Sequence, residues 1–237
     1  MIFEFANPKR FMTLSGALLP WFAGAAIILL GVGLYLGLFV APPDYQQGDT
    51  VRIMFIHVPA AWVAMMAYGL MALASLFSLV WRHPLADVAA KTAAPLGALF
   101  TTLALITGSL WGKPMWGTYW QWDGRLTSFL ILLFLYLGYI ALWNAIEDEL
   151  RAGRAAAILA LVGVVNLPII KFSVDWWTTL HQGESIFRPD GPTISAVFIW
   201  PLFLMAFGYT ALFMTLWMIR IRTEILERRA RTLMLGH

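Results

Sequence analysis

No charged side chain interrupts residues 58–81, which read VPAAWVAMMAYGLMALASLFSLVW. A helix crosses the apolar core of a bilayer with about 20 residues, within a range of roughly 17–25. The run is apolar on every face of a helix and lacks the two-residue alternation of a barrel strand. This segment therefore predicts a membrane-spanning helix.

Five further charge-free runs follow the same pattern, at residues 11–43, 92–112, 126–146, 155–170 and 191–219. The run at 155–170 is short, but Arg154 and Lys171 at its ends can extend their charged groups toward water. The chain is thus predicted to be an all-α integral membrane protein with six transmembrane helices in a single membrane domain, 1–237. The predicted spans are about 18–40, 59–81, 93–111, 127–146, 154–173 and 194–218.

The composition of the whole chain agrees with this class. Hydrophobic residues make up 60% and charged residues 12%, with a mean hydropathy of +0.74, against about 45–50% and 25% in soluble proteins. A water-soluble enzyme core and a disordered chain are therefore excluded. The absence of cysteine excludes disulfides, iron–sulfur clusters and covalent haem attachment within this chain.

The basic residues predict the orientation. Of the 16 Lys and Arg residues, 11 fall on the side that carries both termini and 5 on the other side. The positive-inside rule then places both termini in the cytoplasm, and the net charge of +3 records this bias rather than nucleic-acid binding. The first apolar run is longer than the core of a signal peptide, so we expect it to remain as a span.

Two of the four histidines fall on the outer side of this topology. His57 stands at the outer end of the second span in FIHVPAAW, and His181 lies in the last outer loop in LHQG. Two neutral imidazoles on one face could hold a metal, above all a haem iron. Each is also explained as an ordinary interfacial polar residue. His83, in an inner turn, and His237, the last residue, are expected to be solvated and inert.

A tryptophan-rich outer loop, residues 111–126, separates the two histidines in the sequence. It begins WGKPMWGTYWQWDGR, with four tryptophans in twelve positions. We predict an aromatic platform for a flat macrocycle, in which Trp120 and Trp122 share one face of an extended segment. The alternative is an interfacial aromatic belt, which does not explain the glycines and proline between the rings. The platform residues are Trp111, Trp116, Trp120 and Trp122.

Three charged residues complete the candidate site. Asp123 is placed to cap the fourth span, or to accept a hydrogen bond from an arginine, an indole or a ligating imidazole. Arg52 and Arg125 could hold carboxylates such as haem propionates, although ordinary flanking charge explains them equally. The run GSLWGKP at 108–114 is one residue short of a phosphate loop and lacks its Ser or Thr, so no nucleotide site is expected.

The tryptophan-rich loop closely resembles the WWD signature of haem-handling proteins. The matching residues read WGKPMWGTYWQWDGRLTS. Together with FIHVPAAW, LHQG, the six spans and the short length, they resemble the cytochrome c maturation protein C (CcmC) family. The similarity covers essentially the whole chain, with Tyr119 and Gly124 where that family often has Trp and Ala.

The resemblance implies a multi-pass protein of the bacterial inner membrane that delivers haem on the periplasmic side. Because the sequence shows no acid–base or nucleophilic constellation, the chain is not expected to be an enzyme. The resemblance also implies that His57 and His181 are axial ligands of a non-covalent b-type haem held by the tryptophans and Asp123. The implied partners are the membrane haem chaperone CcmE, the transporter subunits CcmA and CcmB, and the small membrane protein CcmD, within membrane lipid.

Two other functions fit the same residues. A membrane b-type cytochrome also pairs histidines, but usually inside its spans rather than at a helix end and in a loop. A permease could use the tryptophans as a cage for a flat solute or a quaternary ammonium ion. A Soret band in the purified protein distinguishes haem binding from the permease.

Overall fold

The computed structural model describes residues 7–177, 179–183 and 185–235, and no strand occurs in this part of the chain. A π-helical turn, η2 (Leu36–Val40), continues the first helix, and a 3-10 helix, η3 (Asp49–Ile53), precedes the second. The α-helices are α1 (Pro8–Tyr35), α2 (Met54–Trp81), α3 (Ala86–Trp116), α4 (Gly124–Ala145), α5 (Glu149–Gly163), α6 (Asn166–Trp176) and α7 (Ala196–Leu235).

Six helical stretches are long and apolar enough to cross a membrane, which confirms the predicted all-α membrane class. Each overlaps one predicted span, and most continue beyond it, because a helix satisfies its own backbone hydrogen bonds even where its side chains become polar. The stretches are Pro8–Val40, Asp49–Trp81, Ala86–Trp116, Gly124–Ala145, Glu149–Trp176 and Ala196–Met234.

The fifth span is not the single uninterrupted helix predicted over 154–173. A turn at residues 164–165 divides it into α5 and α6. Pro168 explains the break, because proline lacks an N–H group and its ring clashes with the carbonyl four residues earlier. The buried Asn166 then donates from its side chain to the Ser128 carbonyl at 2.9 Å. This hydrogen bond fastens the start of α6 to α4.

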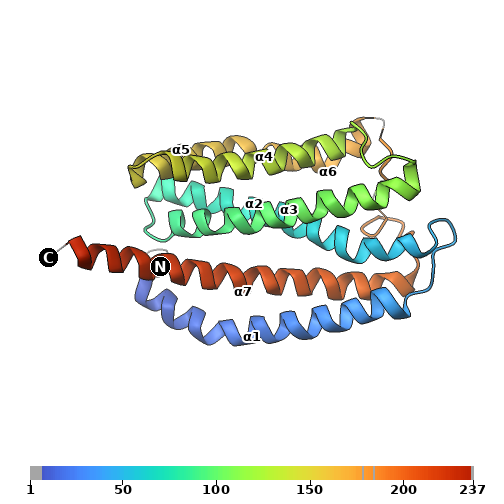
Figure 1. Cartoon of the computed structure of the whole chain (residues 1–237), viewed down its shortest axis with the longest axis horizontal. Helices are drawn as coiled ribbons and strands as arrows, with labels where there is room; N and C mark the ends of the chain where they lie inside the picture. The colour runs from blue at the N-terminus through green and yellow to red at the C-terminus, as the bar shows by residue number, and fades with distance from the viewer. Residues whose placement is uncertain (1–6, 178, 184, 236–237) are drawn as a thin grey trace.

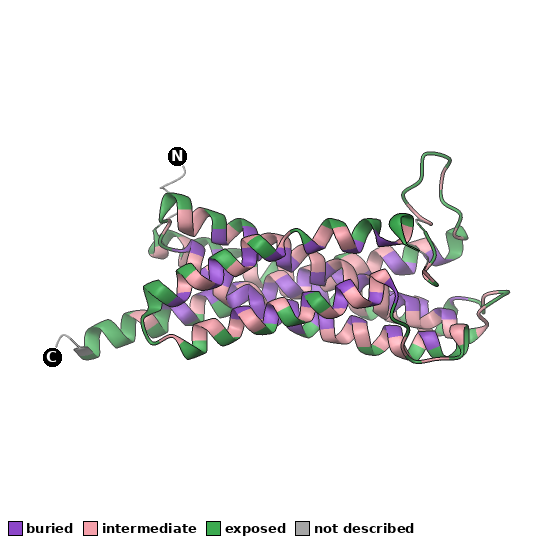
Figure 2. Ribbon diagram, turned by 90° about the horizontal axis from the view of Figure 1, so that it is seen from above, coloured by how far each residue is buried: buried purple, intermediate pink, exposed green. Residues whose placement is uncertain are grey.

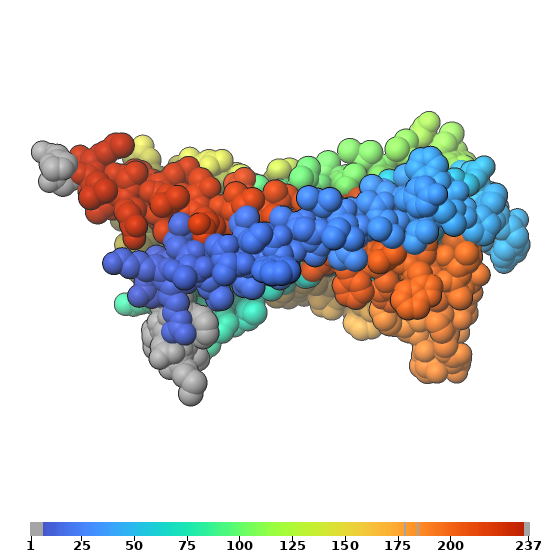
Figure 3. Space-filling view, turned by 90° about the horizontal axis from the view of Figure 1, so that it is seen from below, coloured from blue at the N-terminus to red at the C-terminus, as the bar shows by residue number. Residues whose placement is uncertain are grey.

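The helices form three layers: α1 with α7, α2 with α3, and α4 with α5 and α6 (Figure 1). Small residues allow the layers to approach. The buried Tyr136 of α4 lies against Gly97 of α3, and its hydroxyl donates to the Ala64 carbonyl of α2 at 2.8 Å. Gly33 of α1 packs against Met205 of α7, and Figure 3 shows α1 lying along α7.

Many outward-facing side chains are large and apolar. Ile27, Trp200 and Phe207 are 74%, 73% and 61% exposed, and Figure 2 shows exposed positions along the outer faces with buried positions between the helices. Apolar surface of this extent indicates contact with lipid rather than water. The start of α1 and the end of α7 lie at one end of the bundle, called here the terminal end (Figure 1). The tryptophan-rich loop lies at the opposite, distal end.

Candidate functional site

The structure brings the two predicted histidine ligands to the distal end from separate elements. His57 lies in the first turns of α2, whereas His181 lies in the segment between α6 and α7. The two side chains are close enough to interact electrostatically, and Arg125 of α4 interacts with both. The distal end therefore gathers residues that the sequence places far apart.

The His57 ring is fixed by α3. Its Nδ1 atom lies 3.0 Å from the Ala104 carbonyl oxygen and 3.2 Å from Thr107 Oγ1. Because a carbonyl oxygen only accepts, Nδ1 is assigned the proton, and Nε2 keeps the lone pair that can bind a metal. The Trp111 ring meets this imidazole edge-on, with 5.7 Å between ring centroids. Gly108 makes the approach possible, since a Cβ there would lie 2.9 Å from His57 Cε1.

Asp123 fixes the second histidine. Its Oδ2 atom lies 2.8 Å from His181 Nδ1 and accepts from Thr179 Oγ1 at 2.5 Å. Its Oδ1 atom accepts from the Leu126 backbone N–H at 2.7 Å, which caps α4. The cap and the imidazole acceptor, the two roles that the sequence leaves open for Asp123, are therefore both present. The carboxylate orients the ring through Nδ1, and Nε2 has no hydrogen-bond partner in the part of the chain that the structure describes. A second group positions a ligating histidine in the same way in many metal sites.

The protonation of this pair follows from its surroundings. Burial lowers the pKa of His181 below its ordinary value, and the hydrogen bond to Asp123 offsets this only in part. Burial raises the pKa of Asp123, but hydrogen bonds from Thr179, the Leu126 N–H and His181 outweigh it, so that pKa is lowered overall. The pair is thus a neutral imidazole beside a carboxylate, and the neutral imidazole is the form that binds metals.

The four platform tryptophans occupy three environments. Trp111 lies beside His57 and donates from its indole N–H to Gln47 Oε1 at 3.0 Å. Trp116 lies edge-on to His181, with ring centroids 4.8 Å apart. The rings of Trp120 and Trp122 meet edge-on, with their centroids 5.4 Å apart. Each histidine therefore has its own neighbouring tryptophan, while the last two rings form a separate pair.

The irregular part of the tryptophan-rich loop is shorter than the predicted 111–126. Helix α3 continues through Trp116 and ends at Gly117, whose φ of +76° is a left-handed conformation that favours glycine. Only residues 117–123 separate α3 from α4. Trp111 and Trp116 are thus presented by a helix, and Trp122, which is 75% exposed, by the connecting segment.

The two predicted arginines differ in position. Arg52 donates to the Leu38 carbonyl and pairs with Asp49 at 3.1 Å, so it fastens η3 to the end of η2. Arg125 donates to the Lys171 carbonyl at 3.3 Å and interacts electrostatically with Asp123. Its Nε atom is buried without a hydrogen-bond partner among the described residues. Arg125 is therefore the better placed of the two to meet an anionic group near the histidines.

An open groove adjoins the site between α4 and α6. It has a volume of about 590 Å³, and its lining includes Trp122, Asp123, Asn166 and Trp177. Asp123 thus lies at the edge of this groove with its carboxylate buried. His83 lies at the other end of the molecule, in the turn between α2 and α3, and His237 lies outside the described residues.

The comparisons with known proteins place the chain in a family. The sequence model described as Heme exporter protein C matches residues 1–236. The chain belongs to the CcmC family. A Bradyrhizobium diazoefficiens protein named Heme exporter protein C is 61% identical over 232 residues, which is 98% of this chain and 88% of that protein.

Other CcmC-family proteins with the same name are similarly close. The protein of Escherichia coli (strain K12) is 50% identical over 229 residues, which is 96% of this chain and 92% of that protein. The Paracoccus denitrificans protein is 48% identical over 234 residues, which is 98% of this chain and 97% of that protein. The resemblance to CcmC seen in the tryptophan-rich loop and the two histidine motifs is thereby confirmed.

Proposed function

We propose that this chain binds haem at the distal end of the bundle, between His57 and His181, and delivers it to the membrane haem chaperone CcmE for cytochrome c maturation. One observation carries the proposal: each imidazole has its Nδ1 atom at a hydrogen-bond acceptor, and its Nε2 atom makes no hydrogen bond to any described residue. Two such imidazoles suit an iron whose remaining four ligands come from a porphyrin. The names of its relatives agree with haem as the cargo.

A bare metal ion fits the same residues less well. A protein-bound zinc ion takes three or four side-chain ligands, and the described residues contain no group of three or more His, Asp or Glu side chains suited to one. Haem needs only the axial pair. Two buried donors, Trp120 Nε1 and Arg125 Nε, also have no partner among the described residues. Such orphaned groups are rare in native structures unless a ligand or water satisfies them.

The surrounding residues have separate tasks in this proposal. Trp111 and Trp116 hold the two imidazoles in orientation and exclude water from the iron ligands. Arg125 meets a propionate, because its guanidinium matches a carboxylate. Haem supplies the iron and the flat apolar surface that the chaperone receives. The exposed Tyr119 and Trp122 offer rings to that partner at the membrane surface. The chain acts as the haem-delivery subunit beside CcmA, CcmB and CcmD, with ATP hydrolysis belonging to CcmA.

The delivery role predicts a separation between haem retention and haem transfer. Replacing both Trp120 and Trp122 with alanine is expected to impair transfer to purified CcmE several-fold more than it lowers haem retention, because the rings that contact the two histidines are Trp111 and Trp116 rather than this pair. Haem per protein and CcmE loading are measured on equal amounts of folded protein. The matched control, Trp21→Ala with Trp200→Ala, removes two exposed rings from outward faces of the helices. Equal transfer by both variants would refute the docking role.

The proposal also requires the distal end to face the periplasm, in the bacterial inner membrane. The chain has no cysteine, so single cysteines can be labelled without background. Cysteines at Tyr45 and Tyr119, both exposed at the distal end, are expected to react with an impermeant reagent added from outside, whereas one at Glu147 is not. The reverse pattern in intact spheroplasts would place the site in the cytoplasm and contradict the proposal.

Gly108 provides a test of the His57 position. The Gly108→Ala variant is expected to bind haem about tenfold more weakly, because the added methyl group displaces the His57 ring from its hydrogen bonds. Gly31→Ala is the control, since a Cβ at that helical position meets nothing within 4 Å. Haem titration followed by absorbance measures both. Unchanged affinity in Gly108→Ala would show that the His57 position does not matter for haem.

A further inference from the structure

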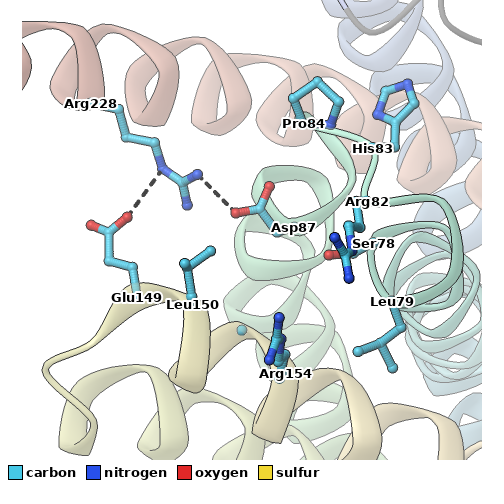
Figure 4. A pocket seen from close by; sticks show the side chains of 11 residues that line it. Ser78, Leu79, Arg82, His83, Pro84, Asp87, Glu149, Leu150, Arg154 and Arg228 are labelled. Atoms are coloured by element: carbon cyan, nitrogen blue, oxygen red, sulfur yellow. Dashed lines mark hydrogen bonds and ion pairs between the residues drawn. The ribbon is translucent and has the colours of Figure 1, made fainter.

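A cavity of about 520 Å³ lies at the terminal end of the bundle, opposite the haem site. Figure 4 shows its lining, which comes from the end of α2, the following turn, α3, α5 and α7. We propose that this cavity binds the phosphate group of an anionic phospholipid. His83, which the sequence indicates is inert, is one of the residues on its wall.

The arginines that line the cavity differ in whether they already form ion pairs within the chain. Arg228 pairs with Asp87 at 2.8 Å and with Glu224 at 2.9 Å, so its charge is already balanced within the bundle. Arg82 and Arg154 also line the cavity, and neither guanidinium has a hydrogen-bond partner within the described part of the chain. The Nη2 atom of Arg228 is buried and unpaired as well. Guanidinium groups match phosphate oxygens in geometry and charge.

The backbone conformation of Arg82 supports a role for this residue in binding. Its φ of +49° makes it a non-glycine residue in the left-handed region. This conformation is unfavourable for a residue with a Cβ and is found concentrated at binding sites. Arg82 ends α2, with its backbone N–H donating to the Phe77 carbonyl. The turn thereby places Arg82 on the cavity wall, where Figure 4 shows it across from α7.

The apolar surface beside the cavity favours a lipid over free phosphate. Leu79 and Leu150 lie on the cavity wall. Leu150, Arg154 and Ile158 are spaced by four residues and therefore share one face of α5. Leu150 and Ile158 are 76% and 56% exposed on that face. An acyl chain can follow this face from the cavity into the membrane, and basic pockets between membrane helices are known to hold anionic head groups.

Native mass spectrometry of the full chain released from vesicles of phosphatidylglycerol and phosphatidylcholine tests the proposal. The wild-type chain is expected to retain phosphatidylglycerol preferentially. The variant Arg82→Ala with Arg154→Ala is expected to lose this retention by roughly tenfold or more, because two charge-assisted contacts are removed. Arg220→Ala with Arg229→Ala removes the same charge from exposed positions outside the cavity and is expected to behave as wild type.

Three outcomes would overturn the inference. Equal lipid retention in the cavity variant and wild type would show that the cavity does not bind the head group. An equal loss in the Arg220 and Arg229 control would show a general charge effect. Release of the lipid by millimolar inorganic phosphate would identify free phosphate as the ligand. If the double variant does not fold, Arg154→Ala alone, at an exposed position of α5, gives the same comparison. Haem binding at the distal end is expected to be unchanged throughout.

Discussion

Replacing both His57 and His181 with alanine is expected to abolish haem binding while leaving the six-span bundle intact. Both imidazoles lie at the distal end with Nδ1 at a hydrogen-bond acceptor, and the double variant removes both proposed axial ligands. The loss of affinity is expected to exceed the 10–100-fold that follows removal of an outer partner of a metal ligand. Haem per folded protein after purification, with thermal unfolding as the check on folding, measures this effect.

His83 provides the matched control for the histidine variants. It lies in the turn at the terminal end, on the wall of the other cavity. His83→Ala is expected to retain haem as the wild type does. Imidazole added to His181→Ala is expected to restore part of the binding, because it supplies the missing nitrogen ligand without rebuilding the chain. Haem retained at wild-type levels by the double histidine variant would contradict the assignment of both ligands.

Asp123→Ala is expected to have the second largest effect. The substitution removes the helix cap of α4 and the acceptor that orients Thr179 and His181. Loss of the cap costs about 0.5–2 kcal/mol of stability, and loss of the imidazole acceptor costs about 10–100-fold in haem affinity. Thermal unfolding of the haem-free chain and haem titration measure the two contributions separately.

Asp123→Asn separates the two contributions within one residue. Asparagine caps helices about as well as aspartate, so stability is expected to be near that of the wild type while haem affinity falls. Asp148→Ala is the control for the cap alone, because Asp148 caps α5 through the Leu150 and Arg151 N–H groups at the other end of the bundle. Normal haem affinity in Asp123→Asn would show that the carboxylate does not orient the ligand.

The sequence predicts the membrane fold well because one quantity decides it, the free-energy cost of placing a charged side chain in the bilayer core. Because this cost makes charged residues rare in the core, the charge-free runs mark the spans directly. The division of the fifth span was not predicted, since hydropathy averages over Pro168, whose effect is on the backbone. The capping position of Asp123 was predictable as well, because capping depends on residues only three positions apart.

The neighbours of the histidines were not predictable from one sequence. Thr107 and the Ala104 carbonyl reach His57 only through the packing of α3 against α2, which no local pattern specifies. Gly108 and Gly112 did carry a signal, since their spacing puts two glycines on one helical face. In the sequence they belong to a run that partly resembles a phosphate loop. In the structure they lie against the rings of His57 and Trp116. Their function is to allow close packing.

The coordination of the bound iron tests the central claim most directly. Resonance Raman spectra of haem bound to the wild-type chain and to His57→Ala and His181→Ala give the number and type of axial ligands. Ligation by His57 and His181 predicts a six-coordinate low-spin iron in the wild type and a five-coordinate iron in each single variant. The same six-coordinate spectrum in all three proteins, or no haem in the wild type, would contradict the claim that this chain holds haem between these two histidines.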